Sequence, residues 1–502
     1  MNAPDSLLLS GTLLSSLLAS VLIFGLDERS VRLRTLLNLG SALLKLAFIA
    51  VMLWGVMQGR SYELRLPLLP GNDLLLRADA LALLFVSLSA GLWLLTTVYA
   101  VAYLEGAPHR SRFFGFFSLC VSATVGIALA GNLITFFLFY ELLTLSTYPL
   151  VVHRGTPKAL AAGARYLAYT LGGGAALLAG IVWLQAIAGG AVEFRHTGVG
   201  ALLGPQHGPA LLAIFALMMA GVGVKAALLP LHGWLPQAMV APAPVSALLH
   251  AVAVVKSGAF GVVRIVHDVF GVEFAARLGV LTPLAWVAAA TILYGSLRAL
   301  VQDDLKRRLA YSTVSQVAYI VLGTAMLGPL ASIGGLVHLV HQGVLKITLF
   351  FCAGNYAETL GIHKVSEMAG VGRRMPWTTA AFSIGALGMI GVPPLAGFIS
   401  KWYLGLGALE AGMPVMLAVL MASSLLNAAY FLPILRAAWF GTPPAAWPDE
   451  HIPARDRWET QRWLLLPPLV AAALALLIGL GAGTELSPLD WVRLIVAREY
   501  GQ

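Results

Sequence analysis

Long, nearly uninterrupted apolar segments constrain this chain more than any other feature. Of its 502 residues, 59% are hydrophobic and 11% are charged, whereas a soluble domain carries about 25% charged residues. A helix of about 20 apolar residues spans the hydrocarbon core of a bilayer. The sequence therefore predicts an all-α membrane protein with about fourteen transmembrane helices, near residues 6–26, 36–57, 79–104, 113–130, 132–152, 163–189, 210–240, 244–267, 281–301, 309–327, 331–353, 377–409, 412–440 and 462–482.

Two of the predicted helices are interrupted by prolines: Pro230 and Pro236 in the seventh, Pro393 and Pro394 in the twelfth. Proline removes a backbone donor and clashes with the preceding turn. A pair of interrupted helices in corresponding positions indicates inverted repeats around a site at the membrane midplane. We expect N-terminal helices 1–3 (1–112), a five-helix repeat of helices 4–8 (113–267), a second repeat of helices 9–13 (281–440), and a loop, helix 14 and C-terminal tail (441–502).

One glutamate and four lysines lie within these apolar segments: Glu141, Lys225, Lys256, Lys346 and Lys401. Each charge at the bilayer centre costs roughly 2.5–3.5 kcal/mol unless it meets another charge, water or a backbone dipole. Burial favours the neutral amine and a nearby carboxylate favours the ammonium. Opening and closing a pair of Lys225 with Glu141 would therefore switch the lysine between releasing and holding a proton. The five groups predict a proton relay in one shared interior.

Each of these groups also has a structural interpretation. Glu141 could be hydrogen-bonded to a neighbouring helix, while Lys225 and Lys401 could reach the membrane interface along their aliphatic stems. Lys45 lies outside the two predicted repeats, and we expect it to reach the interface in this way.

Three histidines add titratable groups to the predicted relay: His250, His338 and His341. His338 and His341 have metal-ligand spacing, but no third ligand lies nearby in sequence, so we expect a hydrogen-bonded wire and no metal. Cys120 and Cys352 have no CxxC partner. The chain carries no dinucleotide, haem, iron–sulfur or ATP motif, and we expect no cofactor.

The net charge of +9 is distributed as in a membrane protein rather than a nucleic-acid-binding one. Loops after odd-numbered helices hold most of the basic residues, including Arg110, Arg112, Arg307 and Arg374. By the positive-inside rule these loops are cytoplasmic. We therefore expect a multi-pass protein of the bacterial cell inner membrane with both termini outside.

Four segments resemble the antiporter-like membrane subunits of respiratory complex I and of multisubunit Mrp cation/proton antiporters: FFLFYELLTLSTY around Glu141, GVKAALLPLHGWLPQAM around Lys225, APAPVSALLHAVAVVKSGAFGVVR around Lys256, and KRRLAYSTVSQVAYIVLG. The resemblance covers about residues 79–430 and is closest to the D-type subunits of Mrp antiporters. It implies fourteen helices, inverted five-helix repeats with broken helices 7 and 12, and a hydrated axis. By resemblance the axis glutamate is Glu141 and its lysines are Lys225, Lys256, Lys346 and Lys401.

These observations predict a proton-translocating subunit of a multisubunit sodium/proton antiporter, with other membrane subunits as partners and no enzymatic activity of its own. One alternative is a proton-pumping subunit of a complex I-like NADH/quinone oxidoreductase or membrane hydrogenase. A second is the energising subunit of an inorganic-carbon uptake complex. A third is a scaffold whose charges only hold helices together.

Overall fold

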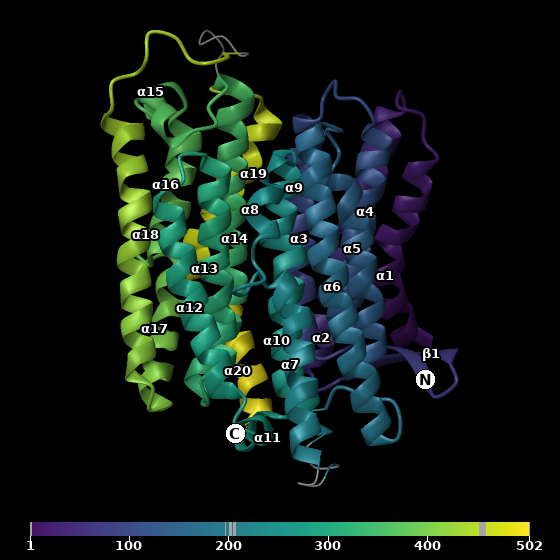
Figure 1. Ribbon diagram of the computed structural model, residues 1–502. Helices are drawn as coiled ribbons and strands as arrows, with labels where there is room; N and C mark the ends of the chain where they lie inside the picture. The colour runs from purple at the N-terminus through teal and green to yellow at the C-terminus, as the bar shows by residue number, and fades with distance from the viewer. Residues whose placement is uncertain (1–2, 196, 200–202, 204–206, 451–457, 501–502) are drawn as a thin grey trace.

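The computed structural model describes residues 3–195, 197–199, 203, 207–450 and 458–500, and these form a bundle of helices that run roughly side by side (Figure 1). The helices of the first half are α1 (Ala3–Phe24), α2 (Val31–Met57), α3 (Ala80–Tyr103), α4 (Arg110–Leu129), α5 (Leu133–Val151), α6 (Pro157–Ala188), α7 (Gly208–Lys225), α8 (Trp234–Gln237), η3 (Ala238–Val240), α9 (Ala243–Ala247), η4 (Leu248–Val252), α10 (Val254–Arg264), η5 (Ile265–Phe270) and α11 (Val272–Arg277). Those of the second half are α12 (Leu281–Leu300), α13 (Leu305–Ala325), α14 (Pro329–Leu360), η6 (Val365–Glu367), α15 (Val371–Arg374), α16 (Pro376–Ile390), α17 (Ala396–Glu410), α18 (Pro414–Phe440), α19 (Arg462–Leu480) and α20 (Pro488–Glu499).

The predicted number of membrane passages agrees with the structure. Within the described residues, 12 helical stretches are long and apolar enough to cross a membrane. The more polar α13 and the α16–α17 pair run alongside them through the bundle (Figure 1). Together they make the fourteen passages expected from the sequence. In Figure 1, α1 begins and α20 ends at the lower end of the bundle.

Two segments contain elements outside the fourteen predicted helices. Residues 58–78, between the second and third predicted helices, contain the antiparallel hairpin of β1 (Tyr62–Leu69) and β2 (Asn72–Ala78). Tyr62 and Leu64 are buried while Glu63 is partly exposed and Arg65 is exposed, which is the two-residue alternation of a strand with one face covered. The C-terminal tail contains α20, whose leucine, valine and isoleucine side chains are buried. Residues 451–457 of the last segment lie outside the described residues.

Both predicted helix breaks are present. α7 ends at Lys225 and the chain becomes helical again only at Trp234, while α16 ends at Ile390 and α17 begins at Ala396. Pro230, Pro393 and Pro394 lie within the breaks. Pro236 does not, because it belongs to the short helix α8 that follows the first break.

The eighth predicted helix, near 244–267, is not regular. It contains the π-helical turn η4, and Ala253 with φ −119° and ψ −80° separates that turn from α10. A π-helical turn holds an extra residue, so positions before and after it do not keep the 100° phase of a regular helix. His250 in η4 and Ser257 in α10 therefore do not keep the shared face that a regular helix would give them.

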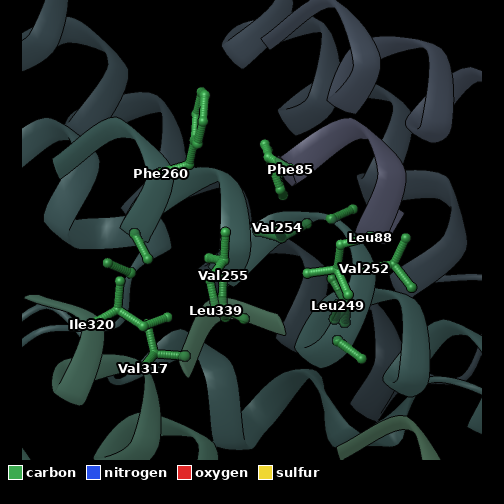
Figure 2. Close-up of a cluster of buried hydrophobic side chains, with 14 of the residues drawn as sticks. Phe85, Leu88, Leu249, Val252, Val254, Val255, Phe260, Val317, Ile320 and Leu339 are labelled. Carbon is green, nitrogen blue, oxygen red and sulfur yellow. The ribbon is translucent and has the colours of Figure 1, made fainter. Parts of the chain in front are cut away.

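The centre of the bundle is closely packed and apolar. Figure 2 shows side chains of this region, among them Phe85 of α3, Val255 and Phe260 of α10, Ile320 of α13 and Leu339 of α14. Phe85 and Phe260 stack with their ring centroids 4.7 Å apart. A charged side chain in this environment must find its partners among backbone carbonyls, other polar side chains or water.

Candidate functional site

The first buried charge pair lies between α5 and α7. Lys225 is fully buried, and its ammonium donates a hydrogen bond to the backbone carbonyl of Tyr140 and lies 3.3 Å from the centre of the Tyr140 ring. Glu141 follows Tyr140 on α5, but its Oε1 is buried without a hydrogen-bond partner among the described residues. The expected partners are thus adjacent, yet the lysine binds a carbonyl dipole instead of the carboxylate.

The carboxylate of Glu141 faces α6 at a glycine. A Cβ built on Gly174 would lie 2.8 Å from Cδ of Glu141, so only glycine leaves this space free. The neighbouring Gly173 is also at a close contact, because a Cβ there would lie 2.8 Å from Cγ2 of Val224 on α7.

Close packing also joins Lys225 to the second lysine. A Cβ on Gly258 of α10 would clash with the backbone of Ala226, the residue after Lys225. Two residues before Gly258, the fully buried Lys256 donates a 2.7 Å hydrogen bond to the carbonyl of Leu339 on α14. Lys256 therefore connects the first half of the bundle to α14.

A chain of hydrogen bonds links the two lysines of the second half. Lys346 donates to Ser312 Oγ at 2.7 Å, and Tyr430 donates to the same oxygen at 2.8 Å. Tyr430 also contacts Asn427, which donates to the carbonyl of Met389 at 3.3 Å. Lys401 donates to that carbonyl at 2.9 Å. Tyr430 and Asn427, both on α18, were not singled out from the sequence.

A polar seam lies between α10, α13 and α14. Seven side chains of these helices and of η4 contain buried nitrogen or oxygen atoms that have no hydrogen-bond partner within the described residues: His250, Ser257, Gln316, Tyr319, His338, His341 and Gln342. Buried polar groups are nearly always satisfied by protein or ordered water. Ordered water in this seam would satisfy these atoms.

The three histidines occupy different places along this seam. His338 Nδ1 lies 2.8 Å from Ser400 Oγ of α17, next to Lys401, and the His338 ring stacks on Tyr319 with centroids 5.2 Å apart. His250 stacks on Phe350 and both its ring nitrogens lack partners in the described structure. Within the described residues, no group of three or more His, Cys, Asp or Glu side chains could hold a metal ion.

Two buried charged groups lie in environments that the sequence did not predict. Lys45 does not reach the interface: it is fully buried, it donates to Ser16 Oγ at 2.5 Å, and its ammonium lies 4.9 Å from the centre of the Trp93 ring. Arg264 of α10 was not singled out from the sequence; it is also buried and pairs with Asp79 and Asp268, at 2.8 Å each. The apolar sequence around Lys45 was the available signal, because snorkelling from the middle of a long helix is unfavourable.

The fold and the buried basic groups define a multi-pass membrane protein whose interior carries protonatable side chains from both halves of the bundle. Residues 130–427 match the family described as NADH:quinone oxidoreductase/Mrp antiporter, TM. The chain belongs to this family, which confirms the resemblance found in the sequence.

Individual relatives differ in the complexes that their names describe. The chain is 39% identical over 412 residues to NADH-quinone oxidoreductase subunit N of Desulforudis audaxviator, covering 80% of this chain and 81% of that protein. It is 30% identical over 442 residues to the A/B subunit of a probable K(+)/H(+) antiporter of Rhizobium meliloti, covering 86% of this chain but 42% of that protein. A chain in the structure of the Mrp complex from Dietzia sp. DQ12-45-1b superposes with a TM-score of 0.86 over 99% of this chain and 98% of that chain, at 24% identity, and therefore shares the fold.

Proposed function

We propose that this protein is a proton-translocating membrane subunit, of the Mrp D type, in a multisubunit sodium/proton antiporter of the bacterial cell inner membrane. The proposal depends above all on one observation. Buried lysines from both halves of the bundle bind backbone carbonyls and hydroxyls: Lys256 reaches α14 of the second half, and Lys346 and Lys401 share one chain of hydrogen bonds, beside a seam of buried polar side chains. Such groups inside a membrane are costly and typically mark ion or proton pathways.

Each group has a role in this proposal. Lys225 takes up a proton near Glu141 and returns it when the distance to the carboxylate changes, because the carboxylate favours the ammonium form. Lys256 passes protons between the halves, and His250, His338 and His341 exchange them with the seam. Lys346 and Lys401 complete the relay through Tyr430. The proposed division at residues 1–112, 113–267, 281–440 and 441–502 places one break in each repeat.

Sodium movement would require partner membrane subunits, because no cation-binding group of carboxylates is present in the described residues. The basic loops would face the cytoplasm and both termini the outside, since Lys and Arg concentrate on the cytoplasmic side of membrane proteins.

A second candidate keeps the relay but changes its energy source. The 39% identical relative is named as a subunit of an NADH-quinone oxidoreductase, which favours a proton-pumping role beside redox subunits in a complex I-like enzyme or membrane hydrogenase. Neighbouring genes would separate these candidates: small antiporter subunits for the first and iron–sulfur subunits for the second. A zinc-containing partner would favour the inorganic-carbon uptake complex.

The decisive experiment uses everted vesicles containing the whole complex, energised to form a pH gradient. Addition of sodium should dissipate the gradient in the wild type and much less in Lys225→Ala and Glu141→Ala. Glu273→Gln, a surface carboxylate whose side chain is 90% exposed, provides the matched control. Unchanged transport in both variants with intact assembly would favour the scaffold, while a response to NADH but not to sodium would favour the redox-driven complex.

A further inference from the structure

A cavity of about 580 Å³ opens at the end of the bundle opposite to the start of α1. It lies where the chain enters α6 and α13, beside η3 and the last turns of α14 (Figure 1). None of the proposed relay residues lines it. Its basic lining consists of Arg154, Lys158, Arg165, Lys306 and Arg307, with His363 close by.

The five cations of this basic cavity have no carboxylate partner. Within the described residues, none of them forms an ion pair within 4.0 Å. Arg165 donates to the amide oxygen of Gln237, and Lys306 donates to the carbonyl of Ala241. Five unpaired positive side chains around one space attract an anion.

The lining also contains one acidic group, Asp304, whose charge offsets one of the five cations. Asp304 is the N-cap of α13, and its Oδ1 accepts a 2.8 Å hydrogen bond from the backbone N–H of Arg307. The same cap places the positive end of the α13 dipole at the cavity. The first turn of α6, which begins at Pro157 after the N-cap Thr156, lines it as well. The excess positive charge is therefore reinforced by backbone dipoles.

Apolar side chains, including Ala161, Ala162, Val240 and Ala243, also line the cavity, together with polar ones such as Gln237. A cavity lined by both cations and small apolar side chains fits a phosphate group attached to an apolar body. Basic pockets between transmembrane helices on the cytoplasmic side bind phospholipid headgroups for this reason.

We propose that the basic cavity binds a phosphate-bearing anion, either the headgroup of an anionic phospholipid or free phosphate. Arg165 and Arg307 would hold the phosphate oxygens, since guanidinium groups match their geometry. Lys158 and Lys306 would add charge, and the apolar wall would contact the glycerol and the first acyl carbons of a lipid.

The test uses the complex purified in a neutral detergent and depleted of lipid. Native mass spectrometry would count retained dioleoyl-phosphatidylglycerol against dioleoyl-phosphatidylcholine, and a parallel titration with inorganic phosphate would follow thermal stability. The cavity variant is Lys158→Gln/Arg165→Gln/Arg307→Gln. The matched control Arg29→Gln/Arg32→Gln/Arg373→Gln removes three exposed charges from the same end of the bundle but outside the cavity.

The wild type and the control should bind one phosphatidylglycerol, or one phosphate, at least about tenfold more tightly than the cavity variant. Preference for phosphatidylglycerol identifies the lipid as the source, and a response to inorganic phosphate without lipid preference identifies the free anion. Arg165→Lys/Arg307→Lys keeps the charge but loses the guanidinium contacts, and its affinity should lie between those of the wild type and the cavity variant. Equal binding by the wild type and the cavity variant would overturn the proposal, as would failure of the intact complex to bind either probe. These readouts do not depend on transport.

Discussion

The ammonium of Lys401 lies 2.8 Å from the carbonyl oxygen of Ile390, the last residue of α16. Lys401 belongs to α17, so its side chain reaches back across the break to the carboxyl end of the preceding half-helix. The C-terminal carbonyls of a helix lack intrahelical partners and carry partial negative charge. Gly391, with φ +96°, leaves room for this path, because a Cβ there would lie 2.8 Å from Cδ of Lys401.

Removing this ammonium should therefore affect both stability and transport. Lys401→Met removes the ammonium donor from the carbonyl of Ile390 and the hydroxyl of Ser424, and it leaves the carbonyl of Met389 with a single side-chain donor. We expect a loss of about 1–3 kcal/mol of stability and of most transport, measured by thermal unfolding in detergent and by sodium-dependent gradient dissipation. Lys364→Met, in the loop after α14, should change neither quantity, and wild-type transport in Lys401→Met would contradict the proposed relay.

The hydroxyl of Tyr430 provides the link between Lys346 and Lys401. Tyr430→Phe keeps the ring but removes its contacts with Ser312 and Asn427. Transport should fall at least about tenfold, because an interrupted proton path loses a positioned transfer group, while assembly stays intact. Tyr356→Phe removes a similarly buried hydroxyl that bonds to Thr379 outside the relay. Equal transport by the two variants would exclude Tyr430 from the path.

These contacts show what the sequence could and could not predict. Apolar segment length and proline spacing predicted the passages and both breaks, because those features depend on local sequence and bilayer thickness. The charged residues were recognisable because each is isolated in an apolar segment. Their partners were not, because Tyr140, Leu339 and Met389 contribute backbone carbonyls, which every residue possesses. Only the folded chain determines which carbonyl meets which lysine.

The lysine spacing at the two breaks illustrates the same limit. Lys225 precedes Pro230 and Lys401 follows Pro394, so the sequence offers no common rule. In the structure Lys225 is the last residue of α7, and Lys401 contacts the last carbonyls of α16. Both lysines are therefore associated with the carboxyl end of the half-helix before the break, and the long lysine side chain makes up the difference in position.

Acid should weaken the attachment of the β1–β2 hairpin to the bundle. Glu193 accepts hydrogen bonds from Arg65 at 2.7 Å and Arg77 at 3.1 Å, and the bond from Arg65 is the main cause that lowers the pKa of this carboxyl. Both arginines also pair with Glu63. A lowered folded-state pKa means that the stabilisation is present above the unfolded-state pKa, about 4.3, and is lost as the pH falls through the folded-state value.

Hydrogen–deuterium exchange of residues 62–78 at pH 7 and pH 3 would measure this effect. Protection should fall in acid by less than about 1 kcal/mol, because the pairs are partly exposed. Glu193→Gln should already be less protected at pH 7 and should change less with pH, whereas Glu273→Gln should behave as the wild type. An unchanged pH response in Glu193→Gln would show that the ion pairs do not hold the hairpin.

Lys45 should be dispensable for transport although it is as buried as Lys225. Its described partners, Ser16 and the Trp93 ring, belong to α1 and α3, outside the two repeats. Replacing a buried amine by an apolar side chain of similar length is often neutral or stabilising. We expect Lys45→Met to unfold at the wild-type temperature or slightly above and to transport normally. Lys225→Met, the same change at an equally buried site, should abolish transport, and equal losses in both would place Lys45 in the path.

The space beside Glu141 gives the sharpest test of the first pair. A Cβ on Gly174 would lie 2.8 Å from Cδ of Glu141, whereas a Cβ on Gly172, two residues earlier in the same helix, would meet nothing within 4 Å. Gly174→Ala should therefore displace the carboxylate and disturb its coupling to Lys225, while Gly172→Ala should be neutral or slightly stabilising, because alanine is the better helix former. Gradient dissipation measured from pH 6 to pH 9 should change its pH profile only in Gly174→Ala. Because both variants add a single methyl group to α6, identical profiles would mean that the position of the Glu141 carboxylate does not control proton uptake.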